Sequence, residues 1–330
     1  MSALSVPERE RISTPHSLDE DSGLRKRHIA AGASWHVARS RKILHAHPEL
    51  RAAIGPDPRS AIAIVGLVVL QFGVAAALRD VPWYVAAAIG WAFGAVVAHA
   101  LGVAIHECAH DLVFKTRWMN KALGIVANLP LGLPGAIDFR EQHMRHHASL
   151  GAQDGSDTQT PGEREIAFTG RSVVQRLVWL SVGSIVFNGS PTQHRAASTR
   201  AWITANIVFC AAMWPLSIAV GFSSFVYLVM AAWMAFGLHP VGARRYAEHY
   251  QRDGVDQPTL SYYGLGNWVA LNVGYHVEHH DLPGIAWHRL PMVRRTAHEH
   301  YDGLATMGGW TRHLWTLIVD RSPAARYPSR

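Results

Sequence analysis

The sequence WYVAAAIGWAFGAVVAHALGVAIHECAH, residues 83–110, joins two signals without a break. Its first 23 residues contain no Asp, Glu, Lys or Arg, and about 20 apolar residues suffice for a helix to cross the hydrocarbon core of a membrane. The apolar run leads directly into H-E-x-x-H, which places His106 and His110 one helical turn apart on one face. The segment therefore predicts a membrane-spanning helix that carries metal ligands at its end.

Three further windows are long and apolar enough to span a membrane. The connection RDVP at 79–82 and the single Gly221 are too short for anything but tight helical hairpins. We therefore predict an all-α integral membrane protein with four transmembrane helices arranged as two hairpins, and a helical cap that holds a His-rich site for two metals. The predicted spans are 61–78, 83–105, 201–220 and 222–242.

Positive charge marks the side on which the cap lies. Thirty of the 31 Lys and Arg residues fall in segments 1–59, 115–200 and 244–330, which two hairpins place on the same side. The positive-inside rule assigns that side, with both termini and the metal site, to the cytoplasm. The net charge of +7 is thus explained by the membrane, and no nucleic-acid partner is expected.

The chain is expected to form one membrane domain with a cytoplasmic N-terminal segment. Residues 1–59 form that segment, and its first 30 residues, charged and without periodicity, are expected to be disordered. Residues 60–330 form the membrane domain, with cytoplasmic parts at 106–200 and 243–330. The weaker apolar stretches at 121–137 and 171–187 are expected to lie at the cytoplasmic interface, or one of them as a buried re-entrant piece.

Three histidine clusters share one spacing rule, because residues three or four apart lie on one face of a helix. After H-x-x-x-H come HMRHH at 143–147 and HVEHH at 276–280, all in segments expected on the cytoplasmic side. His249 follows the fourth span and is a candidate ninth ligand. The predicted metal ligands are His106, His110, His143, His146, His147, His249, His276, His279 and His280.

Eight or nine imidazoles are too many for one metal, since a catalytic zinc takes three protein ligands and keeps one open position. The clusters therefore indicate two metals with room for water, dioxygen or substrate. Imidazole binds zinc, copper, iron and nickel, so ligand type alone does not identify the metal. A metal site beside a membrane is expected to act on lipid chains, whose methylene groups are chemically unactivated. Iron with dioxygen can remove hydrogen from such a group and zinc cannot, so iron is favoured. Cys108 and Cys210 are too few for a four-thiolate iron–sulfur cluster.

Polar neighbours of the clusters are candidates for fixing the orientation of the ligand rings. Asn272 lies one helical turn before the third cluster and can bond a metal-bound water. His239 can be a ligand or a hydrogen-bonded interior side chain. A rival hypothesis is an intramembrane zinc protease that uses His106, Glu107 and His110. The supporting candidates are Glu107, Asp111, His239, Asn272, Glu278 and Asp281.

The clusters resemble the histidine boxes of the membrane fatty-acid desaturase and hydroxylase superfamily. Longer strings resemble the sphingolipid Δ4-desaturases, also called dihydroceramide desaturases, from about residue 35 to about residue 300. These strings are RKILHAHPELRAAIGPDP (41–58), AIHECAHDLVF (104–114), ANLPLGLP (127–134), GLHPVGARRYAEHY (237–250) and SYYGLGNWVALNVGYHVEHHDLPGI (261–285).

The resemblance implies a non-haem di-iron centre that uses dioxygen and two electrons, with the box histidines and His249 as ligands. It implies a trans double bond between C4 and C5 of the sphingoid base of dihydroceramide. Sphingolipid C4-hydroxylation is the neighbouring alternative, followed by another fatty-acyl desaturase or hydroxylase activity. This chain departs from many family members at Arg244, where they carry His, and its second residue is Ser2 instead of a myristoylatable Gly.

The electrons are expected from a separate protein. The sequence contains no C-x-x-C-H haem motif and no G-x-G-x-x-G nucleotide motif. A cytochrome-b5-like or ferredoxin-type donor is therefore implied, docking around Arg289, Arg294 and Arg295. The same arginines can instead attract anionic lipid headgroups.

Overall fold

The structure is a computed structural model that describes residues 31–152, 156–159, 161, 163–186, 197–250, 255–321 and 323. In this part of the chain the regular elements are helices, and strand-like pairing is confined to isolated bridges. The predicted all-α class is confirmed for these residues. The first 30 residues, expected to be disordered, lie outside the described ranges.

The first two spans are formed by three consecutive helices and one irregular turn. Helix α3 (Arg59–Ala77) is followed by α4 (Trp83–Ile89). Helix α4 continues through a π-helical turn, Gly90–Gly94, into α5 (Ala95–Ala109). The span predicted to end at residue 105 therefore continues to Ala109, because the H-E-x-x-H residues remain helical beyond the last apolar side chain.

The second pair of spans is α10 (Ala197–Val220) and α11 (Phe222–Phe236), which meet at Gly221. After a break at residues 237–239, α12 (Pro240–Ala247) continues in the direction of α11. All four predicted spans are found as helices long and apolar enough to cross a membrane, which fits an integral membrane protein.

Helix α11 lies at the centre of the spans and packs against α3, α4, α5 and α10. A Cβ at Gly94 would lie 2.7 Å from the Cβ of Ala231 and 2.9 Å from the Tyr227 ring, so this contact requires glycine. Tyr227 donates to Gln71 Oε1 at 3.0 Å, and both side chains are fully buried. Close small residues and internally satisfied polar groups are both typical of helix packing in lipid.

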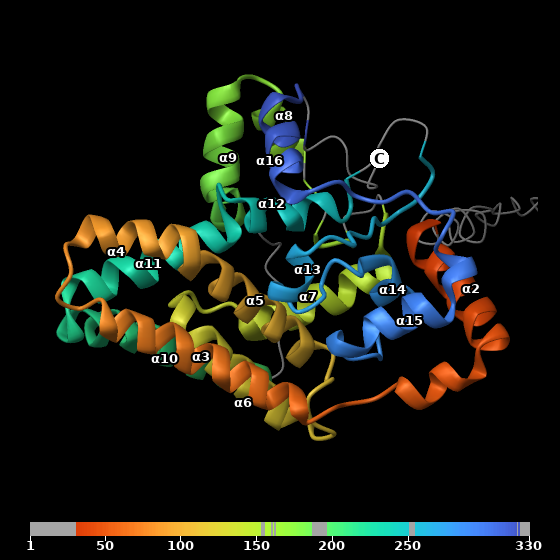
Figure 1. Ribbon diagram of the computed structural model, residues 1–330, viewed down its shortest axis with the longest axis horizontal. Helices are drawn as coiled ribbons and strands as arrows, with labels where there is room; N and C mark the ends of the chain where they lie inside the picture. The colour runs from red at the N-terminus through yellow and green to blue at the C-terminus, as the bar shows by residue number, and fades with distance from the viewer. Residues whose placement is uncertain are drawn as a thin grey trace, which may run out of the picture.

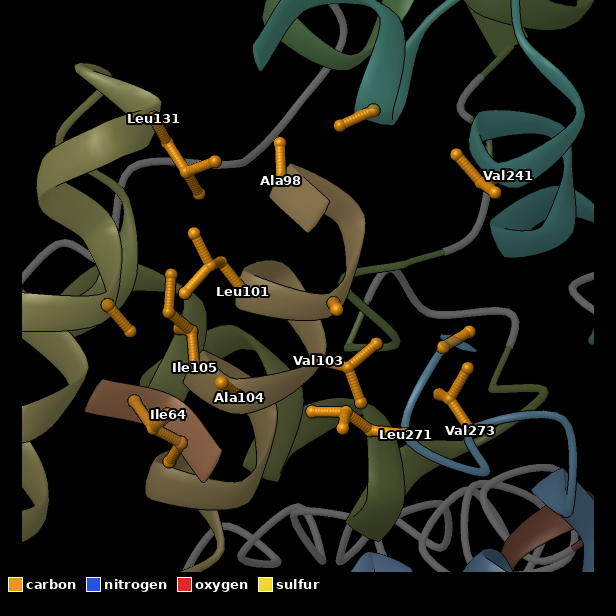
Figure 2. Packing of buried hydrophobic residues seen from close by; sticks show 14 of the residues in the cluster. Ile64, Ala98, Leu101, Val103, Ala104, Ile105, Leu131, Val241, Leu271 and Val273 are labelled. Atoms are coloured by element: carbon orange, nitrogen blue, oxygen red, sulfur yellow. The ribbon is translucent and has the colours of Figure 1, made fainter. Parts of the chain in front are cut away.

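Helix α5 is buried on opposite sides by different parts of the chain (Figure 2). On one side Leu101 and Ile105 lie toward Leu131, while on the other Val103 points toward Leu271 and Val273. The helix that carries the first histidine box is thereby fixed between the other spans and a loop that comes much later in the sequence.

The stretch expected at the interface around 121–137 is bent. Helix α6 (Arg117–Asn128) packs along α5 and α3, and the chain then turns through Leu129–Leu131 into α7 (Ala136–Ser149), at 114° to the preceding helix. Asn128 Oδ1 accepts from the backbone of Ala136 at 3.0 Å and from Asn206 Nδ2 at 3.1 Å, which fixes the bend. The bent pair is apolar and long enough to be a broken span or a re-entrant loop.

The second weak apolar stretch forms α9 (Val173–Val186), after the short α8 (Glu163–Thr169). Val173, Val174 and Val178 are exposed on it, as expected for a helix whose apolar face meets lipid headgroups.

The remaining helices lie mainly at the end of the bundle where α5 finishes (Figure 1). The earliest described helix packs against the helix of the third histidine box. These elements are α2 (Ala31–Ala46), α13 (Gly266–Val269), α14 (His276–Asp281), α15 (Leu290–Thr296) and α16 (Trp310–Val319), with 3-10 turns at Pro48–Ala53, Trp287–Arg289 and His298–His300.

Candidate metal centre

Four segments bring the predicted ligands together. Helix α5 supplies the first box, α7 the second and α14 the third, and His249 follows α12. Because the i, i+3 and i, i+4 positions share a face, each box presents its rings to the space where the segments meet. All nine predicted ligands lie there, in two adjoining groups.

The first group contains five histidines. Ring nitrogen Nε2 of His106 lies 3.0 Å from Nε2 of His279, which in turn lies 3.1 Å from Nε2 of His147. Nε2 of His143 lies 3.0 Å from Nε2 of both His147 and His110. Five equivalent nitrogens thus surround one small space. The members of this five-histidine group are His106, His110, His143, His147 and His279.

The second group contains four histidines. Nε2 of His249 lies 3.1 Å from Nε2 of His146 and 3.0 Å from Nε2 of His276. The ring of His280 lies 4.5 Å from that of His276, centroid to centroid, and 5.3 Å from that of His249. This four-histidine group adjoins the first, since the rings of His280 and His147 stack at 4.1 Å.

These distances fit metal ions better than a hydrogen-bonded network. Two nitrogens at right angles around a metal, each bound at about 2.1 Å, are about 3.0 Å apart. A neutral imidazole offers only one N–H, so several Nε2 atoms facing one another cannot all be donor and acceptor. Burial lowers the pKa of His110 to about 3 and the pKa values of His249 and His279 well below the usual range. Lowered pKa values favour the neutral form of these three rings, which is the form that binds metal.

Two carboxylates lie beside the Nδ1 atoms of the four-histidine group, on the far side of the rings from the Nε2 contacts. Asp157 Oδ1 lies 2.7 Å from Nδ1 of His146, and Asp157 also accepts from the backbone N–H groups of Gly151 and Gln159. Glu248 Oε1 lies 3.3 Å from Nδ1 of His276 and forms a buried ion pair with Arg244. A hydrogen-bonded partner such as Asp157 sets the tautomer and orientation of a ligand ring, whereas Glu248 makes a charge contact with His276 and no hydrogen bond.

Helix α2 contributes a third support. Asp281 lies 2.7 Å from Nδ1 of His36 and accepts from Arg39 Nε at 3.0 Å. Nε2 of His36 lies 3.1 Å from Thr259 Oγ1, so both ring nitrogens of His36 are engaged. Its ring lies 5.0 Å from that of His280. His36 is therefore a neighbour of the four-histidine group and not a ligand.

The predicted supporting carboxylates are found in different surroundings. Glu107 is buried, with Oε1 3.6 Å from Nδ1 of His106 and Oε2 accepting from the N–H of Trp287. Glu107 therefore lies beside His106 without a hydrogen bond to its ring, and its role as an orienting carboxylate stays a prediction. Glu278 instead accepts from the hydroxyls of Ser261 and Tyr263, both at 2.7 Å.

The other candidates make contacts away from the rings. Asp111 pairs with Arg140 at 2.6 Å instead of with a histidine. Asn272 donates to the carbonyl of Trp287 at 3.4 Å. His239 caps α12 by accepting from the N–H of Val241, as a hydrogen-bonded interior side chain.

Three supporting residues were missed in the sequence. His36 is absent from the predicted residues, and it lies buried beside His280. Asp157 follows the second box after an irregular segment, so no periodicity points to it. Glu248 could have been found, because it adjoins His249 just as Glu107 adjoins His106.

Comparisons with known proteins agree with this geometry. A family model described as fatty acid desaturase matches residues 82–310. The sphingolipid delta(4)-desaturase/C4-monooxygenase DES2 of Homo sapiens is 36% identical over 296 residues, which cover 88% of this chain and 91% of the relative. The sphingolipid delta(4)-desaturase DES1 of Homo sapiens is 34% identical over 86% of this chain and 88% of its own length.

A plant relative gives the same result. The sphingolipid delta(4)-desaturase DES1-like protein of Oryza sativa subsp. japonica is 34% identical over 288 residues, which cover 87% of each chain. The resemblance noted in the sequence is thereby confirmed. With a matching family model over most of its length and relatives aligned nearly end to end, this protein belongs to the fatty acid desaturase family and is an oxidoreductase.

Proposed function

We propose that the protein introduces a trans double bond between C4 and C5 of the sphingoid base of a dihydroceramide-like lipid. The observation that carries the proposal is the convergence of nine imidazoles, in two adjoining groups, at the end of apolar membrane-spanning helices. The named relatives, matched over nearly their whole length, supply the substrate class.

The metals proposed are two irons, one in the five-histidine group and one in the four-histidine group. When bound, such a pair supplies the dioxygen chemistry that removes hydrogen from an unactivated methylene. Ring nitrogens of the two histidine groups would hold the pair, while Asp157 would keep the ring of His146 oriented and Glu248 would lie beside His276. Val103 and Leu271 present apolar surface beside His106 and His279, which keeps water from the reacting carbon.

C4-hydroxylation is the second candidate. One relative carries both activities in its name, desaturase and C4-monooxygenase. Removal of two hydrogens gives the alkene, whereas transfer of one oxygen after the first removal gives the alcohol. The two outcomes differ in how the C4–C5 segment lies over the centre.

The proposal includes the membrane topology. The four spans form two hairpins, residues 60–330 form one domain, and the histidine groups with both termini face the cytoplasm. The distribution of Lys and Arg supports this orientation. The electrons come from a cytochrome-b5-like or ferredoxin-type protein.

The proposed docking site for that donor has only one free arginine in the described residues. Arg289 pairs with Asp57 at 2.7 Å and Arg294 pairs with Asp302 at 2.5 Å. Arg295, on α15, is exposed and has no ion pair among the described residues.

The test is product analysis in cells that make dihydroceramide but lack this activity. Expression should yield a sphingoid base lighter by two hydrogens, and His143→Ala should abolish it, because His143 belongs to the five-histidine group. His45→Ala, on the exposed face of α2, is the matched control and should retain activity. A product that gains oxygen without losing two hydrogens identifies the C4-hydroxylase, and a purified protein with a single zinc and no iron contradicts both candidates.

A further inference from the structure

The loop before the third histidine box carries an exposed apolar tip. Leu265, directly before α13, is 96% exposed, and Trp268, within α13, is 81% exposed. They are the two most exposed large apolar side chains among the described residues. Because they lie three positions apart on one helical turn, both point from the same side of the loop.

Hydrogen bonds within the loop hold its shape and keep the tip exposed, whether or not the loop moves as one body against α5. The side chain of Asn267 bridges the loop, donating to the carbonyl of Tyr262 and accepting from the N–H of Gly274. The N–H of Tyr262 donates to the carbonyl of Gly274 at 2.7 Å, which closes the loop at its base. The ring of Trp310 packs so closely on Gly266 that a Cβ there would lie 2.7 Å from it. These contacts keep Leu265 and Trp268 exposed in the folded protein.

The position of the tip identifies what covers it. Helix α13 packs against α5 (Figure 1), and Leu271 and Val273 of the same loop contact α5 at Val103 (Figure 2). This part of α5 is the last turn of an apolar span before the polar first box, so the tip lies at the level where the bilayer gives way to headgroups. Trp is enriched at that level of membrane proteins.

The inner side of the same loop borders the metal centre. A small cavity is lined by Val103, Leu271 and Val273 together with His106 and His279. It has room for about one water molecule, so an acyl or sphingoid chain enters only if the loop moves. Leu271 and its neighbour Asn272 have left-handed backbone angles, φ 48° and 52°, which a side chain like that of Leu rarely adopts.

We propose that Leu265 and Trp268 insert into the lipid interface, and that the loop of residues 261–275 opens the cavity beside His106 and His279 sideways to the bilayer. A lipid chain then reaches the centre from within the membrane. Insertion of the tip stands on the structure alone, whereas the passage of a substrate chain rests on the proposed function.

The first test measures insertion without any activity. Leu265→Cys and Trp268→Cys are labelled with an environment-sensitive thiol fluorophore and placed in phosphatidylcholine nanodiscs with or without spin-labelled acyl chains. The native Cys108 and Cys210 are buried and do not compete for label. Spin-labelled lipid should lower the fluorescence at both tip positions at least threefold relative to unlabelled lipid. It should leave the fluorescence at His45→Cys on α2 unchanged.

Equal quenching at the tip and at His45→Cys would overturn the insertion. So would a tip label that changes only when a donor protein is added, which would identify the tip as a protein-docking surface. Loss of quenching cannot be confused with a wrong substrate assignment, because no substrate is present.

The second test addresses lateral access. The double variant Leu265→Ser with Trp268→Ser should raise KM for a lipid substrate in the same nanodisc at least fivefold, with kcat and iron content unchanged. Trp315→Ser, which alters an exposed Trp on α16, is the matched control and should change KM less than twofold. An unchanged KM in the double variant refutes lateral access even when quenching confirms insertion.

Discussion

Each imidazole of the centre has two ring nitrogens, and the partner of the far nitrogen controls what the near one can bind. For His146 that partner is Asp157, and the contact is fully buried. For His276 it is Glu248, which is itself paired with Arg244. Arg244 therefore lies behind His276 through the carboxylate of Glu248.

Asp157→Ala removes the acceptor that orients His146. Loss of such a partner typically lowers metal affinity about 10- to 100-fold, so the four-histidine group should release its metal while the five-histidine group keeps it. Iron content after brief chelation should fall from about two to about one per chain, by elemental analysis. Asp80→Ala, on the exposed connection between α3 and α4, should change nothing. Retention of both irons by Asp157→Ala would contradict this role.

Asp57 gives a prediction about pH. A hydrogen bond from the guanidinium of Arg59, with further contacts from Arg289 and His288, holds the pKa of Asp57 well below its usual range. A carboxylate with a lowered pKa stabilises the folded state above its unfolded pKa, and this stabilisation is lost as pH falls toward the folded value. Asp57→Asn should therefore melt at least about 3 °C below wild type at pH 7.

The difference between Asp57→Asn and wild type should shrink as pH is lowered below about 4. Thermal melts of the detergent-solubilised protein between pH 7 and pH 3 measure it, and any general loss of metal in acid affects both proteins alike. Asp80→Asn serves as the comparison, since Asp80 is largely exposed. A difference in melting temperature that stays constant from pH 7 to pH 3 would exclude the ion pairs of Asp57 as its cause.

At the scale of elements, the contact between the π-helical turn and α11 is tested by glycine. Gly94→Ala places a methyl group against Ala231 and Tyr227, and overpacking of this kind costs about 1–3 kcal/mol. Gly66→Ala, in α3, meets nothing within 4 Å and should be neutral or slightly stabilising. Melting temperatures in detergent compare the two; equal values would show that α11 and the π-helical turn can separate freely.

The elements were predictable to different degrees. The four spans could be predicted from composition, because a run of about 20 uncharged apolar residues is typical of a membrane-spanning helix. The helix through His106 continues beyond the predicted span, as the spacing of His106 and His110 predicts. Helix α12 likewise continues the fourth span to Ala247, since buried packing keeps polar residues helical beyond the apolar run. The bend between α6 and α7 depends on Asn128 meeting Asn206, a contact between distant residues that local pattern does not contain.

Helical spacing predicts the candidate ligands, but it does not predict how they divide between the two groups. Within HMRHH, His143 and His147 are one full turn apart and join the five-histidine group, while His146 joins the other. Within HVEHH the division again separates adjacent histidines, His279 from His280. Periodicity explains which residues share a face, but the partner helices determine which group each ring enters.

At the scale of the whole molecule, topology can be tested directly. Asp80→Cys, between the first two spans, should react with a membrane-impermeant maleimide from the non-cytoplasmic side of intact cells or vesicles. His45→Cys should react only after the membrane is opened, because the positive-inside rule places α2 in the cytoplasm. Labelling of both cysteines from the same side would contradict the two-hairpin arrangement.

The placement of α2 against α14 has a consequence for biosynthesis. The centre draws on a helix made before the first span and on a box made after the fourth. During translation the ribosome must therefore finish all four membrane segments before the last ligands exist. Under the proposed di-iron function, metal loading is therefore expected late, after all four apolar helices have been made. Iron starvation should then leave newly made chains with an incompletely packed cap, which proteases cleave faster than the loaded protein.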